Sequence, residues 1–481
     1  MAQEGFGAER RGAGTAHTLG KAQRPCGDAA RGAGVGLQLE QLVDCLGLGN
    51  AVVTPDNMVM HRDRLGLELT AANGEAARAF DDTVWAYVGF AREPGVPLKR
   101  ALQADPQMPM ANVLQGYFMH LMGLPGLVPK ARAAHAAAAK AAAMTSREKA
   151  HVAALGAWCE GELEDVCKRL DAILAEYPRD YLALKVSNYL YFYMGDAASV
   201  RDGPARALKH WDAAMPGYGH LLALHAFGLE ESGDYAAAER QGRRATEINP
   251  ADPWAVHSVA HVMEMQNRAA EGVQWIEGHA AHWDQANFFR FHLWWHLALL
   301  HWGEGRGEEA LKLYDARVWG EGSSENLSLT NDISMLARLE LAGVDVGKRW
   351  DDAAEVVRGQ AGGSVLAFVD AHYAMALGEV PGLQDAGTTG RVHGAAGRAA
   401  CEAAVAWRRK DYAQVVERLA PVRKDLKLLG GSHAQRDVFT LILLDAAIRT
   451  GNRPLADAVR AEREAIRPGA SLPPQLTAVK E

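Results

Sequence analysis

The residues most able to do chemistry in this sequence are histidines spaced four positions apart. The segment from His257 to Glu264 carries imidazoles at 257 and 261 and a carboxylate at 264, and this spacing puts all three on one helical face. His292 and His296 form a second pair about one repeat later. Histidine and glutamate side chains from neighbouring helices are common ligands of metal sites in helical bundles. The pattern leaves three roles open for these histidines: acid–base chemistry or hydrogen bonding to a ligand, a purely structural role, and a divalent metal site at His257, His261 and His292.

A catalytic interpretation of the same stripe uses the carboxylates near it. His257 or His261 would act as a general base oriented by a carboxylate, Glu264 or Asp370, or a bound metal would activate water. His372 follows Asp370 by two positions in an apolar segment and is the further catalytic candidate. Hydrolase or lyase chemistry would fit these groups. The spacing lacks the glutamate of the HExxH motif, so zincin-type chemistry is not indicated.

A repeat of paired helices is expected to position these residues. Apolar helical stretches are interrupted at intervals of 32 to 41 residues, and we place the turns between paired helices at Gly123, Gly161, Gly195, Gly233, Asn267, Gly305, Gly343, Gly378, Lys410 and Gly451. Around Gly233 an apolar helix ends, Tyr235 follows, and Pro250 stops the second helix seventeen positions after the glycine. This order is typical of a tetratricopeptide unit of about 34 residues.

Small residues seven positions before the turns support the same register. Helices that approach closely need small side chains, and seven of the ten positions hold one: Gly116, Ala154, Ala226, Ala260, Ala298, Ala371 and Ala403. No run of alternating Val, Ile and Thr is long enough for a sheet. The sequence therefore predicts an all-α fold, a tetratricopeptide-repeat α-solenoid whose curved stack leaves one concave face.

The histidine stripe also predicts the wall of a pocket on that face. Positions ten, six and three before each turn share one side of the first helix, and they hold His, aromatic residues and single carboxylates rather than the residues of a solvated face. Such a mixture suits a partly enclosed pocket, although the same side chains could instead fill the middle of a tight superhelix. The candidate ligand-binding residues are His151, Lys185, Tyr189, His292, Trp295, His296, Arg436 and Asp437.

Charge and cysteine content limit the partners and the compartment. The 481-residue chain has 51 Lys and Arg against 59 Asp and Glu, and its net charge of −8 gives no overall attraction to nucleic acid or to an anionic membrane. No stretch reaches the about 18 consecutive apolar residues of a membrane helix. Five scattered cysteines without a CxxC pair indicate reduced thiols and a cytoplasmic protein.

Three regions are expected along the chain. Residues 1–57 are interpreted as a disordered or non-native N-terminal extension, because nine of the 49 glycines fall within 1–36 and no periodic pattern occurs there. Residues 58–466 form a single superhelix. Residues 467–481 are expected to be a flexible, non-helical tail, because proline interrupts them soon after Arg467.

Several segments taken together resemble the tetratricopeptide repeat protein 38 family. They are Pro253–Met265, Trp295–Ala298, Asp370–His372 and Ala434–Phe439, with further likeness at Leu182–Ser187 and Tyr191–Tyr193. The resemblance covers about Arg62 to Gly451. It implies a tetratricopeptide superhelix and places the His, Glu and Asp stripe within a family pattern, but it implies no particular reaction.

The function expected from these features is binding in the concave groove. The ligand would be a small molecule or a short peptide end, with hydrolase or lyase activity as an extension and a divalent metal as the candidate cofactor. The alternative is a non-catalytic scaffold that binds a partner's extended tail or helix. The sequence does not name the ligand, and it leaves the oligomeric state open.

Overall fold

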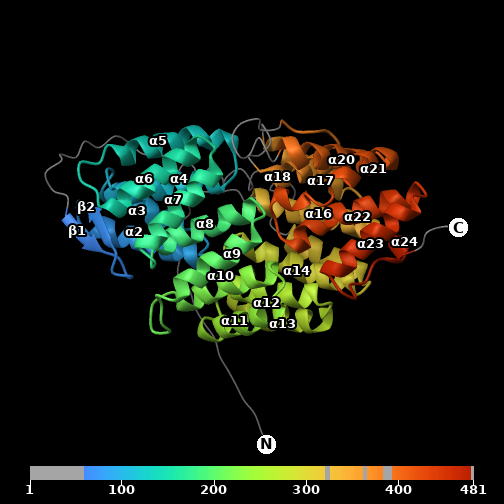
Figure 1. The fold of residues 1–481 in the computed structure, drawn as a ribbon, viewed down its shortest axis with the longest axis horizontal. Coiled ribbons are helices and arrows are strands. Elements are labelled where there is room, and N and C mark those ends of the chain that lie inside the picture. Colours follow the sequence, from blue (N-terminus) through green and yellow to red (C-terminus); the bar gives the residue numbers. More distant parts are fainter. Residues whose placement is uncertain (1–58, 320–324, 361–365, 383–392, 478–481) are drawn as a thin grey trace, which may run out of the picture.

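Antiparallel helix pairs make up nearly all of the described chain (Figure 1). The structure is a computed structural model, and it describes residues 59–319, 325–360, 366–382 and 393–477. Consecutive helices pack on one another, so the predicted helical stack is confirmed as an architecture. The predicted N-terminal extension at 1–57 lies outside the described residues. Within the described ranges, no helix is long and apolar enough to cross a membrane.

The first half of the described chain forms the blue-to-green part of Figure 1. Its elements are β1 (Val59–Arg62), β2 (Glu68–Ala71), α2 (Gly74–Val88), α3 (Gly95–Ala104), α4 (Pro109–Leu121), η2 (Pro125–Leu127), α5 (Val128–Ala139), α6 (Ser146–Cys159), α7 (Leu163–Glu176), α8 (Tyr181–Tyr193), α9 (Ala197–Leu208), α10 (Tyr218–Glu231) and α11 (Tyr235–Ile248).

The second half continues the stack through the yellow-to-red part. Its elements are α12 (Pro253–Met265), α13 (Ala269–Trp283), α14 (Phe289–Gly303), α15 (Gly307–Leu313), η3 (Tyr314–Val318), α16 (Asn326–Leu341), α17 (Arg349–Gly359), α18 (Ala367–Leu377), η4 (His393–Gly397), α20 (Arg398–Arg408), α21 (Tyr412–Val422), η5 (Leu426–Leu429), α22 (His433–Arg449), α23 (Arg453–Ile466) and α24 (Pro474–Thr477).

All ten predicted turns occur where the sequence places them. At each turn residue the backbone φ is positive, from 54° at Asn267 to 84° at Gly233. Glycine adopts this left-handed conformation without a Cβ clash, which is why it commonly ends helices. Asn267 and Lys410 adopt it with a side chain, and the Asn267 amide donates a hydrogen bond to the Gly469 carbonyl at 2.6 Å. Local backbone preference therefore sets where the chain reverses.

The seven small residues predicted at helix crossings are all buried. At Gly116 in α4, an added Cβ would collide with the side chain of Leu155 in α6. The small residues thus let neighbouring helices approach closely, as their spacing predicts.

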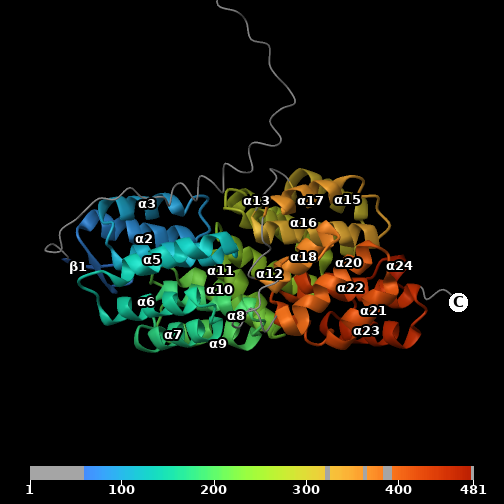
Figure 2. The ribbon, with the colours of Figure 1, turned by 90° about the horizontal axis from the view of Figure 1, so that it is seen from above.

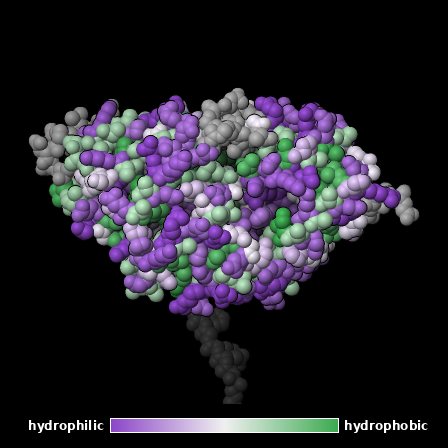
Figure 3. Space-filling model, in the orientation of Figure 1, coloured by the Kyte–Doolittle hydropathy of each residue, from purple (hydrophilic) through white to green (hydrophobic). Residues whose placement is uncertain are grey.

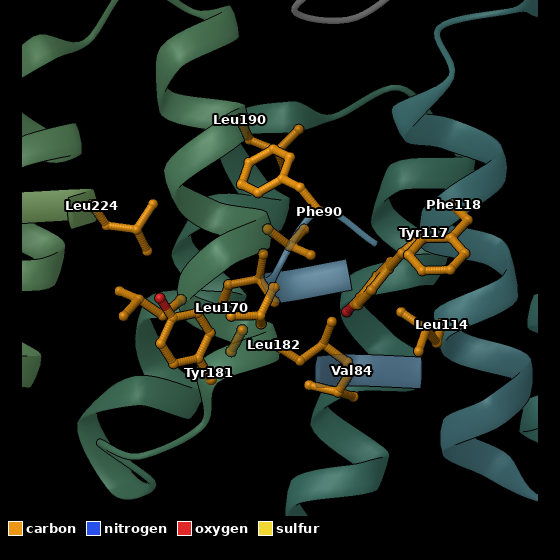
Figure 4. Close-up of a cluster of buried hydrophobic side chains, with 14 of the residues drawn as sticks. Val84, Phe90, Leu114, Tyr117, Phe118, Leu170, Tyr181, Leu182, Leu190 and Leu224 are labelled. Atoms are coloured by element: carbon orange, nitrogen blue, oxygen red, sulfur yellow. The ribbon is translucent and has the colours of Figure 1, made fainter. Parts of the chain in front are cut away.

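Apolar side chains fill both ends of the stack. Figure 4 shows one such cluster, in which Leu114, Leu170 and Leu224 come from α4, α7 and α10. A second cluster joins α14 to the helices that follow it, with Leu329 and Leu441 among its fully buried members. The face of the molecule in Figure 3 is mostly hydrophilic, with small scattered apolar areas. Most apolar side chains are therefore buried between helices.

A short β-hairpin precedes the first helix, and the expectation that the chain contains no sheet is wrong at this point. Strands β1 and β2 pair antiparallel, with Val59 opposite Ala71. The buried carboxylate of Glu148 in α6 accepts hydrogen bonds from the backbone N–H of Thr70 at 2.8 Å and from its hydroxyl at 2.7 Å. Four-residue strands are too short to show a clear alternation in sequence, and this pair is held by a distant side chain.

Segments about 200 residues apart meet in the middle of the molecule. A Cβ at Gly195 would collide with the backbone carbonyl of Lys427, and a Cβ at Gly430 would collide with the carbonyl of Tyr193. The Asn326 amide donates a hydrogen bond to the Met122 carbonyl at 2.8 Å. In both ribbon views β1 and α24 lie at opposite ends of an elongated molecule, joined by the middle repeats (Figures 1 and 2). These contacts between distant backbone segments therefore narrow the groove expected on the concave side.

The segment after α23 also differs from the expected flexible tail. Leu476 in α24 is fully buried, and the Arg460 guanidinium donates to its carbonyl at 3.0 Å. The Gln475 amide donates to the Ala342 carbonyl at 3.1 Å. Proline and glycine prevent a continuous helix here, but they do not prevent packing, so residues through Thr477 belong to the folded stack.

Replacing Gly195 by alanine should destabilise the protein more than replacing Gly233. Both residues have positive φ, so each substitution costs about 1–2 kcal/mol of backbone strain. A Cβ at Gly195 would also meet the Lys427 carbonyl, whereas nothing lies within 4 Å of a Cβ at Gly233. We expect the free energy of unfolding to fall by at least about 2 kcal/mol more in Gly195→Ala, as measured by urea denaturation. Equal losses would contradict the contact between these segments.

Candidate metal centre

Four imidazoles from two neighbouring helices converge in the interior. Helix α12 begins at Asp252, whose carboxylate accepts the Trp254 N–H at 2.9 Å, and it presents His257 and His261 one turn apart. Helix α14 presents His292 and His296 in the same way. One ring nitrogen of each histidine lies within 4.8 Å of the corresponding atom of the other three. The predicted convergence of His257, His261 and His292 is therefore found, and His296 joins them.

The distances between these nitrogens suit a shared metal ion. His257 Nε2 lies 3.0 Å from His292 Nε2, which lies 3.2 Å from His296 Nε2. Two nitrogens bound to one tetrahedral Zn²⁺ at about 2.0–2.1 Å are about 3.3 Å apart. An ion between these rings would need only small shifts of the side chains.

Oxygen acceptors fix the tautomers of two of the rings. His292 Nδ1 lies 3.2 Å from Asn331 Oδ1, and His296 Nδ1 lies 2.9 Å from Glu264 Oε2. Each Nδ1 must therefore carry the hydrogen, which leaves Nε2 of a neutral ring with only its lone pair. The Nε2 atoms of His292 and His296 are then two acceptors 3.2 Å apart, and a cation bound between the rings would satisfy both.

The other two rings are held differently. His261 Nδ1 lies 3.4 Å from Glu230 Oε2, so Nε2 is the nitrogen left for the cluster. His257 Nδ1 is buried without a hydrogen-bond partner among the described residues, and aromatic rings hold this imidazole instead. Its ring centroid is 4.9 Å from Trp254 and 5.0 Å from Phe289. The site is thus walled by aromatic side chains.

Burial keeps most of these imidazoles neutral. His257, His261 and His296 are at most 2% exposed, while His292 is partly exposed. Burial lowers the pKa of His257 and of His292 well below the usual value, and it lowers the pKa of His296 to about 4. Burial opposes charge on His261 too, but the neighbouring Glu230 carboxylate outweighs this effect and raises its pKa.

A buried ionic network extends from the imidazoles to the end of α23. Glu264 accepts from Arg467 at 3.1 Å, and Arg467 also donates to Asp437 at 2.9 Å. Arg463 binds Asp437 through two nitrogens, at 2.9 and 3.1 Å. Burial would raise the pKa of Glu264, but Arg467 and His296 lower it to about 2. Arg463 and Arg467 lower the pKa of Asp437.

Lys185 and Tyr189 lie next to the cluster but belong to an aromatic cage. The Lys185 ammonium sits 4.0 Å from the Phe90 ring centroid and 5.8 Å from that of Trp254, and it donates to the Val88 carbonyl at 3.3 Å. Burial lowers its pKa to about 7. Lys185 thus fills the cage itself.

Trp295 contacts the cluster directly. Its ring stacks on His292 with centroids 5.2 Å apart, and its indole N–H donates to Ser334 Oγ at 3.2 Å.

His151 does not join the metal cluster. It lies in α6, where Nε2 is 3.0 Å from Asp180 and Nδ1 is 3.1 Å from the Tyr117 hydroxyl. Asp180 also binds Arg147 at 2.8 Å. This buried group connects α4, α6 and α8, so its structural role differs from the expected ligand-binding role.

Asp370 and His372 lie on α18. Both are fully buried. The His372 ring packs on Phe368 and Phe439, and its Nδ1–H donates to the Phe368 carbonyl at 2.7 Å. The carboxylates found against the four imidazoles are Glu264 and Glu230, whereas the sequence offered Asp370 beside Glu264 for this orienting role.

Arg436 and Asp437 face different partners. Arg436 lies 3.7 Å from Glu231, whereas Asp437 belongs to the network of Arg463 and Arg467. A surface hollow of about 770 Å³ lies elsewhere, along β1 and α2, and none of the predicted site residues lines it. The stripe predicted to line a partly enclosed pocket is mostly buried, which agrees with the alternative that these side chains fill the interior of the stack.

Asn331 and Arg467 are site residues that were not predicted from the sequence. Nothing in the spacing of Asn331 indicates that it faces His292. Arg467 was taken as the start of a tail, and its contact with Glu264 joins positions 203 residues apart. Glu230 stands three positions before a turn on the predicted stripe, so the register could have identified it. No protein-family model matches this chain.

Replacing Arg467 by methionine should destabilise the protein and change its response to acid. Glu264 and Asp437 would lose a buried partner, which should cost about 3–5 kcal/mol of unfolding free energy at neutral pH. In the wild type, the stabilisation carried by Glu264 is present above its ordinary pKa of 4.5 and is lost as the pH falls towards about 2. The variant should lose less stability across this range.

Urea denaturation between pH 7 and pH 3 measures both effects. Arg453→Met, at an exposed position of α23, is the matched control and should behave like the wild type. The same acid dependence in Arg467→Met and in the wild type would contradict the proposed contribution of this network.

Proposed function

We propose that this chain is a metalloprotein whose four imidazoles, His257, His261, His292 and His296, bind one divalent first-row transition ion, with Zn²⁺ as the simplest occupant. Imidazole nitrogen is a good ligand for zinc, copper, iron and nickel. Two rigid helices supply all four donors in pairs one turn apart. No large rearrangement of the backbone is needed to bring them together.

The observation that carries this proposal is the pair of Nε2 atoms on His292 and His296. Their Nδ1 atoms each contact an oxygen, so the two Nε2 atoms, which lie 3.2 Å apart, are both left as acceptors. A proton between them would put a positive charge in a buried site that opposes it. A metal ion accepts both lone pairs, and contacts such as the one to Glu264 are those that orient metal-bound histidines.

The ion would hold α12 and α14 together. Four protein ligands complete a tetrahedral shell, which is the arrangement of structural zinc sites, whereas catalytic sites keep a position open. This favours metal binding over the two other roles offered by the stripe, a general base and an organic-ligand pocket. Nitrogens about 3 Å apart leave no room for an organic molecule between the rings.

We also propose that the repeats are of the tetratricopeptide type and that the protein is cytoplasmic. The left-handed turns and the buried small residues support a tetratricopeptide-type solenoid, and the resemblance to the tetratricopeptide repeat protein 38 family agrees with that assignment. Cys159, Cys167 and Cys401 are buried free thiols, which supports a cytoplasmic location.

Protein purified without a histidine tag and loaded with Zn²⁺ should retain at least one tightly bound equivalent after dialysis. His292→Ala should lose this ion, because the variant lacks one of the four nitrogen ligands. Cobalt-loaded protein should show the visible absorption of tetrahedral Co²⁺, and the variant should not.

His225→Ala provides the matched control, since this histidine in α10 bonds to Gln241 outside the cluster. It should keep the ion. Circular dichroism checks that both variants are folded. A wild-type protein that retains no ion, or a folded His292→Ala variant with undiminished zinc affinity, would overturn the proposed function.

A further inference from the structure

Two buried glutamates lie beside His261. Glu230 and Glu231 end helix α10, and they are 0% and 7% exposed. One ligand atom of each, and one ring nitrogen of His261, lie within 4.8 Å of one another. A single cation could therefore contact all three side chains.

The carboxylate of Glu230 has the His261 imidazole as a neighbour at ion-pair distance but no hydrogen-bond partner among the described residues. The His261 Nδ1 atom is 3.4 Å from Glu230 Oε2, and it too makes no hydrogen bond. Buried carboxylates are normally paired or bound to metal, because burial without a partner is costly. The unpaired oxygens and the unpaired nitrogen lie on the same side of the His261 ring.

We propose that Glu230, Glu231 and Nδ1 of His261 bind a second divalent transition ion, so that the His261 ring bridges two metal ions. This inference rests on the proposed four-histidine centre, which uses Nε2 of the same ring. When the second ion binds, its bond to Nδ1 replaces the N–H bond, and the proton leaves to solvent. The bridging ring is then an imidazolate with one ion at each nitrogen.

The second site offers one protein ligand fewer than the first. Glu231 Oε1 accepts the His433 backbone N–H at 3.0 Å, and its Oε2 lies 3.8 Å from His433 Nε2, whose side chain is 31% exposed. Arg436 lies 3.7 Å from the same carboxylate oxygen and balances part of its charge. Two carboxylates and one imidazole suit Zn²⁺, Mn²⁺ or Fe²⁺, and they leave further positions to water. The structure thus pairs a closed metal site with an open one.

Metal analysis of the full chain after zinc loading should give two equivalents per chain. Glu230→Gln should reduce this number to one, because the amide keeps the size of the side chain but is a poor metal ligand. Asp332→Asn is the matched control, since Asp332 is another buried carboxylate whose oxygens have no hydrogen-bond partner in the part of the chain that the structure describes. This control should keep two equivalents.

The bridge has its own spectroscopic readout. Copper-loaded wild-type protein should show the weakened, spin-coupled paramagnetic signal of two Cu²⁺ ions joined by an imidazolate, and copper-loaded Glu230→Gln should show an isolated Cu²⁺ signal. One equivalent in the wild type, unchanged in folded Glu230→Gln, would leave the four-histidine centre in place and overturn the second site. No bound equivalent would overturn both.

Discussion

The centre of this molecule depends on one constraint: each polar group that is buried away from water needs a hydrogen-bond or charge partner. Three of the four imidazoles, together with Glu230, Glu264 and Asp437, are nearly or fully inaccessible to solvent. Where a partner of opposite charge is present, as Arg467 is for Glu264, the interior tolerates ionised groups. Where none is present, a cation is the simplest way to satisfy the nitrogen lone pairs and the unpaired carboxylate. The metal proposals follow from this unequal compensation rather than from any one histidine motif.

These groups come together because the last repeats, with α22 and the end of α23, pack against α12 and α16 in the middle of the stack. Neighbouring repeats place α12 beside α14, which assembles the four imidazoles from local contacts. The partners of the imidazoles come from further away: Glu230 from α10, Asn331 from α16, and Arg467 from the end of α23. An open stack of the same repeats would leave the interior face in water, where these side chains would need no partners. Packing of the distant repeats therefore buries the imidazoles and carboxylates, and it also supplies the side chains that partner them.

The sequence predicted the local part of this arrangement well. The turns, the small residues at helix crossings and the pairing of His257 with His261 depend on backbone preference and helical spacing, which neighbouring residues determine. The sequence could not show that Arg467 is packed or that His151 belongs to a separate group with Asp180, because these depend on contacts between distant repeats. It also failed to show that the stripe is buried, since an inward-facing aromatic and histidine surface looks the same whether the stack is open or closed.

The contact between Arg467 and Glu264 has a consequence for how the protein is made. A ribosome synthesises α10, α12 and α14 long before it reaches Arg467, so the early repeats emerge with Glu264 still lacking its cationic partner. The growing chain must keep this carboxylate hydrated until about 200 further residues have been added. The complete ionic network around Glu264 can therefore form only after the end of α23 has been synthesised.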